Sequence, residues 1–206
     1  MRTLIAGILL VLAGCSGTGA APRPSSTVPV IAPGKPGEAA RTLSPGEAAT
    51  AVPSPTANAA DVKYVQDMVV HHRQALDMCV LAPSRASFER VKAIASRIKD
   101  TQAPEIEYLA TWLREQGQRV PGHHAAHTGM PGMATPEQME ALKAASGAAF
   151  DRLFLELMIR HHEGAVRMSA DVLRDGSHTA IRELANEIGA SQGAEIGRMR
   201  RILREL

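Results

Sequence analysis

The pattern of apolar and polar positions changes at about residue 58. From there onward, apolar residues recur every three or four positions, and the first such face holds Val62, Val65, Met68, Val69, Ala75, Leu76 and Val80. This period is typical of an α-helix that buries one face. Because each such face needs a cover, the sequence predicts a bundle of helices over residues 58–206.

Capping residues and helix breakers set the bounds of the predicted helices. Asn58 can cap the first helix, with Asp61 in its first turn, and Pro83 marks its end. The sequence TPEQ at residues 135–138 predicts a capping box with proline at the first helical position. Three longer helices are predicted at residues 87–117, with a kink at Pro104, at residues 147–176, and at residues 177–206.

The two halves of this region repeat each other at a constant offset of 90 residues. MVVHHRQALDM at 68–78 and MIRHHEGAVRM at 158–168 place Met, His-His, Ala and Met at the same spacing. The offset also relates Asp61 to Asp151, Ala95 to Ala185, Ile98 to Ile188, Gln102 to Gln192, Glu105 to Glu195, and Ile106 to Ile196. A duplicated helical hairpin explains this register, and two hairpins predict an all-α four-helix bundle.

The repeated phrases place histidine and methionine on the inward faces of two helices. At about 100° per residue, His72 lies at the centre of the first apolar face, whereas His71 lies nearer its rim with Met78. Methionine often fills gaps in a core, and a single inward histidine is usually a hydrogen-bonded core residue. Two identical His-His pairs favour a shared metal ion, because a buried imidazole without a partner costs about 1–3 kcal/mol. The candidate ligands are Met68, His71, His72, Met78, Met158, His161, His162 and Met168.

The ligand types point to copper. Thioether sulfur favours Cu(I) and imidazole binds both Cu(I) and Cu(II), whereas Mg and Ca prefer oxygen. We therefore expect copper, with Cu(I) favoured. Cys79 also lies inward, but its counterpart is Ser169, so we expect a buried structural thiol there instead of a ligand.

A second group of candidate ligands lies in the segment PGHHAAHTGMPGM, residues 121–133. One interpretation is a solvated tract with incidental histidines. The functional interpretation is a mobile arm that captures a soft metal or closes over the core site. Its candidate ligands are His123, His124, His127, Met130 and Met133, whereas His178 is expected at the surface.

The first residues predict export and a lipid anchor. Arg2 precedes a short apolar stretch that ends in Leu-Ala-Gly-Cys at residues 12–15, which resembles a bacterial lipoprotein signal. Residues 1–14 would be removed and Cys15 lipidated, although an ordinary signal peptide with a chance cysteine is the alternative. Residues 15–57 hold eight of the 13 prolines and predict a flexible linker. The mature protein would lie at the cell surface or in the periplasm, held at a membrane by its lipid.

Composition excludes one class of partner. The net charge is +2 and no basic run concentrates it, while aromatic residues form only 3% of the chain. Neither the electrostatic attraction nor the stacking surfaces of nucleic-acid binders are present, so we expect no nucleic-acid partner.

The chain resembles the bacterial DUF305 family. The resemblance rests on HHRQALDM, MPGM, FDRLFLELMIRHHEGAVRMS and two QxxEI elements, and it covers residues 60–206. It implies a ferritin-like four-helix fold in a small secreted or periplasmic protein and, as in a CopM-like group, copper binding through the eight helical Met and His residues named above. Most members have no assigned activity. Pro104 stands where the other half has Ala194, a departure from two-fold symmetry.

These features give one leading hypothesis and two alternatives. The leading one is a lipid-anchored extracytoplasmic protein of copper homeostasis that sequesters copper or hands it on. One alternative is a helical interaction module with a polar histidine core. The other, a ferritin-like metal-dependent oxidase, is less favoured because Glu-x-x-His motifs are missing. A homodimer, a copper-transfer partner and any enzymatic activity stay open.

Overall fold

The computed structural model describes residues 30–32, 39–44, 47, 56–123 and 129–206. The chain divides into two units, residues 1–52 and 53–206. In the first unit, β1 (Val30–Ala32) and β2 (Arg41–Leu43) pair antiparallel. The linker prediction for residues 15–57 did not anticipate this pair, and the predicted signal peptide and Cys15 lie outside the described residues.

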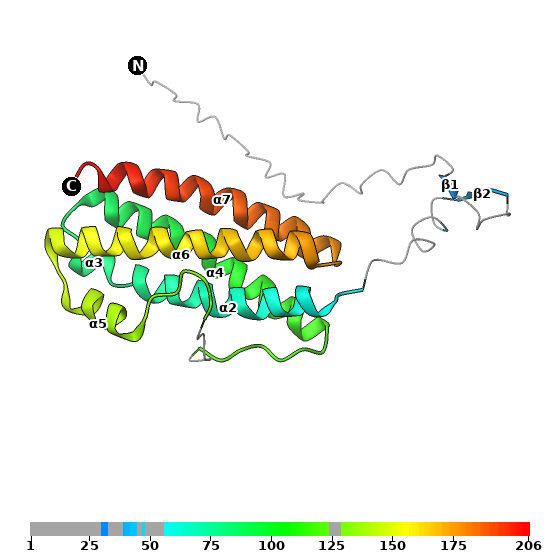
Figure 1. Cartoon of the computed structure of the whole chain (residues 1–206), viewed down its shortest axis with the longest axis horizontal. Coiled ribbons are helices and arrows are strands. Elements are labelled where there is room, and N and C mark those ends of the chain that lie inside the picture. The colour runs from blue at the N-terminus through cyan, green and yellow to red at the C-terminus, as the bar shows by residue number, and fades with distance from the viewer. Residues whose placement is uncertain (1–29, 33–38, 45–46, 48–55, 124–128) are drawn as a thin grey trace, which may run out of the picture. The chain divides into compact units, whose positions relative to one another are not determined.

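The second unit is built from helices. They are α2 (Ala59–Cys79), α3 (Ala82–Arg85), α4 (Glu89–Glu115), α5 (Pro136–Ala144), α6 (Gly147–Asp175) and α7 (Thr179–Leu203), as Figure 1 shows. The hairpins α2–α4 and α6–α7 pack together through α2 and α6. The predicted all-α bundle of two hairpins is confirmed. Among the described residues, no helix combines the length and apolar character that crossing a membrane requires.

Local sequence explains most helix bounds. The Asn58 side chain accepts hydrogen bonds from the backbone of residues 60 and 61, and Thr135 caps α5 together with Gln138, so the predicted cap at Asn58 and the predicted capping box at residues 135–138 are confirmed. Helix α4 continues through Pro104. The prediction was wrong for Val80, because α2 ends at Cys79 and leaves Val80 61% exposed instead of on the buried face.

Each hairpin caps a helix of the other through a buried aspartate. The Asp61 carboxylate of α2 accepts the backbone N–H groups of Ser177 and His178, both at 3.1 Å, at the start of α7. The Asp151 carboxylate of α6 accepts those of Ser87 and Phe88, at 3.2 and 2.9 Å, at the start of α4. First-turn N–H groups lack partners within their own helix, so these carboxylates stabilise both helix starts and lock the hairpins together.

The core has two apolar clusters, with the histidines between them. On α2, Val69 belongs to one cluster and Ala75 to the other. On α6, Met158 and Ala165 are divided in the same way. The two His-His pairs therefore lie midway along the packed helices α2 and α6.

Candidate metal site

Four histidines meet in the centre of the bundle. The side chains of His71, His72, His161 and His162 are all completely buried. The ring centroids of His71 and His161 lie 3.7 Å apart across the α2–α6 contact, and those of His161 and His162 are 6.3 Å apart. The expectation that His71 and His161 lie near the rim was wrong, since neither is exposed.

Two of these histidines are oriented by glutamates within their own hairpin. His72 Nε2 donates to Glu105 Oε2 at 2.7 Å, and His162 Nε2 donates to Glu195 Oε2 at 2.9 Å. Because an ionised carboxylate only accepts, a neutral imidazole in this arrangement carries its proton on Nε2. The lone pair then lies on Nδ1, which in both rings is buried and has no hydrogen-bond partner among the described residues.

His161 has the most unusual environment of the four. Neither of its ring nitrogens has a partner of hydrogen-bonding geometry in the described part of the chain. Burial lowers the pKa of His161 well below its ordinary value, and positive charge on His71, His162 or His72 would lower it further, while the His71 backbone opposes the shift. His161 is therefore a neutral imidazole with an available lone pair.

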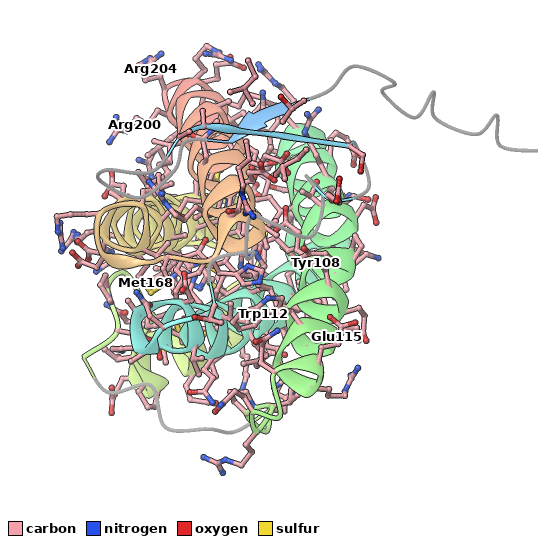
Figure 2. The ribbon with its side chains drawn as sticks, turned by 90° about the vertical axis from the view of Figure 1, so that its right-hand side faces the viewer. Tyr108, Trp112, Glu115, Met168, Arg200 and Arg204 are labelled. Carbon is pink, nitrogen blue, oxygen red and sulfur yellow. The ribbon has the colours of Figure 1, made fainter. Side chains whose placement is uncertain are left out.

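Methionines flank the histidines at helical spacing. Met68 and Met158 are fully buried and lie one turn before His72 and His162. Met78 is also fully buried, whereas Met168 lies between α6 and α2 beside a cavity of about 500 Å³ that Tyr64 and Met130 also line (Figure 2). Each half therefore supplies a buried methionine one helical turn before a buried histidine.

Residues 129–134 cover the site. The Pro131 carbonyl accepts a hydrogen bond from His71 Nε2 at 3.1 Å, and Gln74 bonds both the N–H and the carbonyl of Ala134. A Cβ atom at Gly164 would meet the Pro131 carbonyl oxygen at 2.0 Å, so only glycine permits this approach. Residues 129–134 thus form a docked cover, which agrees with the expectation of a segment that closes over the core site.

The other loop candidates are divided. Met130 and Met133 are half-buried within the docked cover. His123 is exposed and its Nε2 lies 3.1 Å from Asp77, far from a buried environment. His124 and His127 lie outside the described residues.

Sequence reasoning missed two polar core residues. Gln102 on α4 and Gln192 on α7 are 1% and 2% exposed, and neither amide has a partner among the described residues. Each lies one turn before the glutamate that holds a histidine. The sequence did contain a signal for them, because the 90-residue repeat keeps a glutamine at both equivalent positions.

Two expectations about single residues can be compared with the structure. Cys79 is 3% exposed and burial raises the pKa of its thiol to about 12, which agrees with a structural thiol. The prediction of a surface position for His178 was wrong. Its ring is half-buried and its centroid lies 5.3 Å from that of Trp112, because Asp61 holds its backbone at the start of α7.

The residues present fit a soft metal ion. Among the described residues, no three His, Cys, Asp or Glu side chains form a preformed metal site. The buried donors are instead imidazole nitrogens and thioether sulfurs, and in the described part of the chain the nitrogens of His161 have no hydrogen-bond partner. This combination suits copper or a similar soft ion better than a hard, oxygen-seeking ion.

A family model describes most of this bundle. The model for a domain of unknown function, DUF305, matches residues 61–203. The chain belongs to the DUF305 family. The predicted family membership is thereby confirmed, and no curated protein matches the chain.

Solved structures of similar proteins share the fold of this DUF305 chain. A DUF305 fragment from Deinococcus radiodurans is 32% identical, with a TM-score of 0.68, over 74% of this chain and 100% of that one. A DUF305 protein from Streptomyces coelicolor, provisionally described as secreted, is 32% identical, with a TM-score of 0.64, over 71% of this chain and 91% of that one.

CopM in its Cu(II)-bound form is 31% identical to this DUF305 chain, with a TM-score of 0.62, over 70% of this chain and 96% of CopM. CopM also has Cu(I)-bound and silver-bound structures.

Proposed function

We propose that this DUF305 domain binds copper, with Cu(I) favoured, between α2 and α6. The observation that carries the proposal is the His71–His161 pair, whose ring centroids lie 3.7 Å apart and whose side chains are fully buried. Both nitrogens of His161 are buried and have no hydrogen-bond partner among the described residues, which costs about 1–3 kcal/mol per polar group in the metal-free protein. A bound metal ion would offset this cost.

The structures of CopM support the choice of metal. That relative binds Cu(I), Cu(II) and silver. Cu(I) and silver are both soft monovalent ions, for which thioether and imidazole are suitable ligands. The same two ligand types surround the centre of this bundle.

The hydrogen bonds indicate how each histidine would serve. Because Glu105 and Glu195 occupy Nε2 of His72 and His162, these rings would present Nδ1 to the metal. The carboxylates would fix the tautomer and make the rings better donors.

The remaining candidates fall into an inner and an outer group. We assign Met68 and Met158 to the core site, with Met78, Met168, Met130 and Met133 nearby. The loop residues His123, His124 and His127 would form a separate, outer capture group.

We further propose that the protein is extracytoplasmic and is held at a membrane by lipid on Cys15, where it sequesters copper or hands it on. The lipoprotein-like residues 1–15 support this location, as does the resemblance to a Streptomyces coelicolor protein provisionally described as secreted. Mass spectrometry of the native protein checks it. A mature chain that begins with an acylated Cys15 is expected, whereas an unmodified Cys15 would contradict the anchor.

Copper binding is tested by anaerobic titration of the full chain with Cu(I) against a competing chelator. His161→Ala and the Met68→Leu/Met158→Leu pair should each lower the Cu(I) affinity by at least about tenfold, equivalent to about 1.4 kcal/mol. His178→Ala and Met199→Leu are controls, because neither residue is a proposed ligand: His178 packs against Trp112 and Met199 belongs to an apolar cluster. Unchanged affinity in all variants would reject the core site.

A thermal melt of the same samples separates this proposal from the interaction-module alternative. Binding to the folded state must raise the melting temperature. A protein whose histidines only form a polar core would melt at the same temperature with and without copper.

A further inference from the structure

A groove lined by arginine runs between α4 and α7, on residues that the proposed copper site does not use. Its volume is about 810 Å³, and its floor includes Ile94 and Ile202. Four arginines line it and only one acidic residue does, Asp100. The arginines are Arg90 and Arg97 from α4, with Arg198 and Arg201 from α7.

Two of these arginines lie near one carboxylate oxygen of Glu195, a buried residue that does not itself line the groove. Arg97 Nε and Arg198 Nη2 lie 3.7 and 3.9 Å from Glu195 Oε1. Both distances exceed that of a hydrogen bond, so Glu195 attracts these guanidinium groups without occupying their N–H donors. The other oxygen of Glu195 is bonded to His162.

The donors in the groove are incompletely satisfied. Arg198 Nε is buried and has no hydrogen-bond partner among the described residues. Among the described residues Arg201 has no ion pair, whereas Arg90 is paired with Glu205 and Arg198 with Glu195. Asp100, Glu195 and Glu205 offset only part of the positive charge, because four arginines stand against these three carboxylates.

We propose that this groove binds a phosphate group. A guanidinium presents planar, paired N–H donors that match phosphate oxygens, and several arginines around one concavity can bind the same anion. The apolar floor suits a phosphate that carries an organic substituent. The phosphate could belong to an anionic lipid headgroup or to a free soluble anion, and both present the same group to the arginines.

The test uses the full chain and three soluble probes. They are dihexanoylphosphatidylglycerol below its micellar concentration, inorganic phosphate, and 1,2-dihexanoylglycerol, which has the same acyl chains but no phosphate. Calorimetry measures affinity, and NMR signals of the arginine Nε–H groups locate the bound molecule. We expect the phosphatidylglycerol probe, inorganic phosphate or both to bind and to shift the signals of Arg97 and Arg198. Their relative affinities distinguish a lipid source from a free anion.

Paired variants distinguish the groove from general positive charge. Arg97→Gln/Arg201→Gln removes two charges from the groove and should weaken binding by about tenfold or more, as for loss of a charge-assisted hydrogen bond. Arg200→Gln/Arg204→Gln removes two charges from residues of the α7 end that do not line the groove and project from the bundle (Figure 2), and it should change affinity less than about twofold.

Three results would overturn the proposal. They are equal loss of affinity in both pairs, no binding of either anionic probe, or equal binding of dihexanoylglycerol and the phosphatidylglycerol probe, which would indicate contact with acyl chains alone. Circular dichroism of each variant verifies that the helices are intact. Because copper is absent from these samples, the outcome is independent of the proposed copper site.

Discussion

Tyr64 in the first hairpin and Phe154, its counterpart 90 residues later in the second, lie in different environments. The Tyr64 hydroxyl lies 3.1 Å from Ser169 Oγ, whereas the counterparts Phe154 and Cys79 belong to an apolar cluster. By contrast, the bonds from His72 to Glu105 and from His162 to Glu195 occur in both hairpins. The residues that orient the histidines have kept the symmetry of the duplication, while the packing around them has diverged.

The cover over the site breaks the symmetry most clearly. Gln74 holds Ala134 by two hydrogen bonds, but its counterpart Gly164 admits the Pro131 backbone by having no side chain. One segment therefore makes different contacts with two related helices. The cover therefore makes the face of the bundle over the His71–His161 pair different from the rest of this two-fold structure.

The reciprocal aspartate caps should give the largest effects on stability. Asp61→Ala and Asp151→Ala each leave partly buried N–H groups at a helix start without an acceptor and should lower the free energy of unfolding by about 2–4 kcal/mol. Urea denaturation measures this change, with the exposed Asp100→Ala as control. A large loss at one aspartate and none at the other would show that the two caps are not equivalent.

A change of Gly164 to alanine should affect stability in the direction opposite to that of most glycine-to-alanine changes inside helices. Glycine to alanine inside a helix usually stabilises by about 1 kcal/mol, and we expect that result for Gly193→Ala, where a Cβ atom would meet nothing within 4 Å. Gly164→Ala should instead destabilise by about 1–3 kcal/mol, because the new methyl group would displace the cover. Thermal melts of both variants test this contrast. Stabilisation by Gly164→Ala would contradict the docked position of residues 129–134.

The two orienting glutamates should differ in their effect on copper. Glu105→Gln and Glu195→Gln should each weaken Cu(I) binding by about 10–100-fold, as expected for residues that orient a ligand. The loss should be larger for Glu195, whose side chain is 5% exposed against 20% for Glu105. Removal of Glu195 also leaves Arg97 and Arg198 without its negative charge. Chelator competition measures the Cu(I) affinity of both variants. Equal losses of affinity would contradict a larger effect for the more buried glutamate.

A double substitution should convert the Tyr64–Ser169 contact of one half into the apolar Phe–Cys pair found in the other half. Tyr64→Phe alone leaves Ser169 without its partner and should cost about 1 kcal/mol. Adding Ser169→Cys recreates the Phe–Cys pair of the other half and should cost less than the sum of the two single changes. A double-mutant cycle of unfolding free energies gives the coupling. Strict additivity would argue against the Tyr64–Ser169 contact.

Stability of the metal-free protein should fall at acidic pH through His161. Its pKa in the folded state lies well below the ordinary value of 6.5, so the unfolded state binds a proton first as the pH falls below that value. The resulting loss is at most about 1.4 kcal/mol per pH unit for this group, and none is expected above pH 6.5. Urea denaturation of wild type and His161→Gln between pH 7.5 and about pH 5 compares the slopes. Identical slopes would contradict a neutral buried His161.

Much of this architecture follows from periodicity and the internal repeat. Asn58, Thr135 and Gly147 marked helix starts because capping and helix-breaking act locally, and the 90-residue offset predicted two hairpins. The repeated phrases also identified the four central histidines. Helical spacing could not reveal their complete burial, because the cover comes from a distant loop. The roles of Asp61 and Asp151 were equally hidden, since each acts on the other hairpin.

A crystal structure of the Cu(I)-loaded chain, with data collected at the copper absorption edge, tests the central claim most directly. The account predicts an anomalous peak between α2 and α6 at the His71–His161 pair, within reach of Nδ1 of His72 or His162. A peak confined to the outer loop beside His123, with the central histidines unchanged, would contradict it.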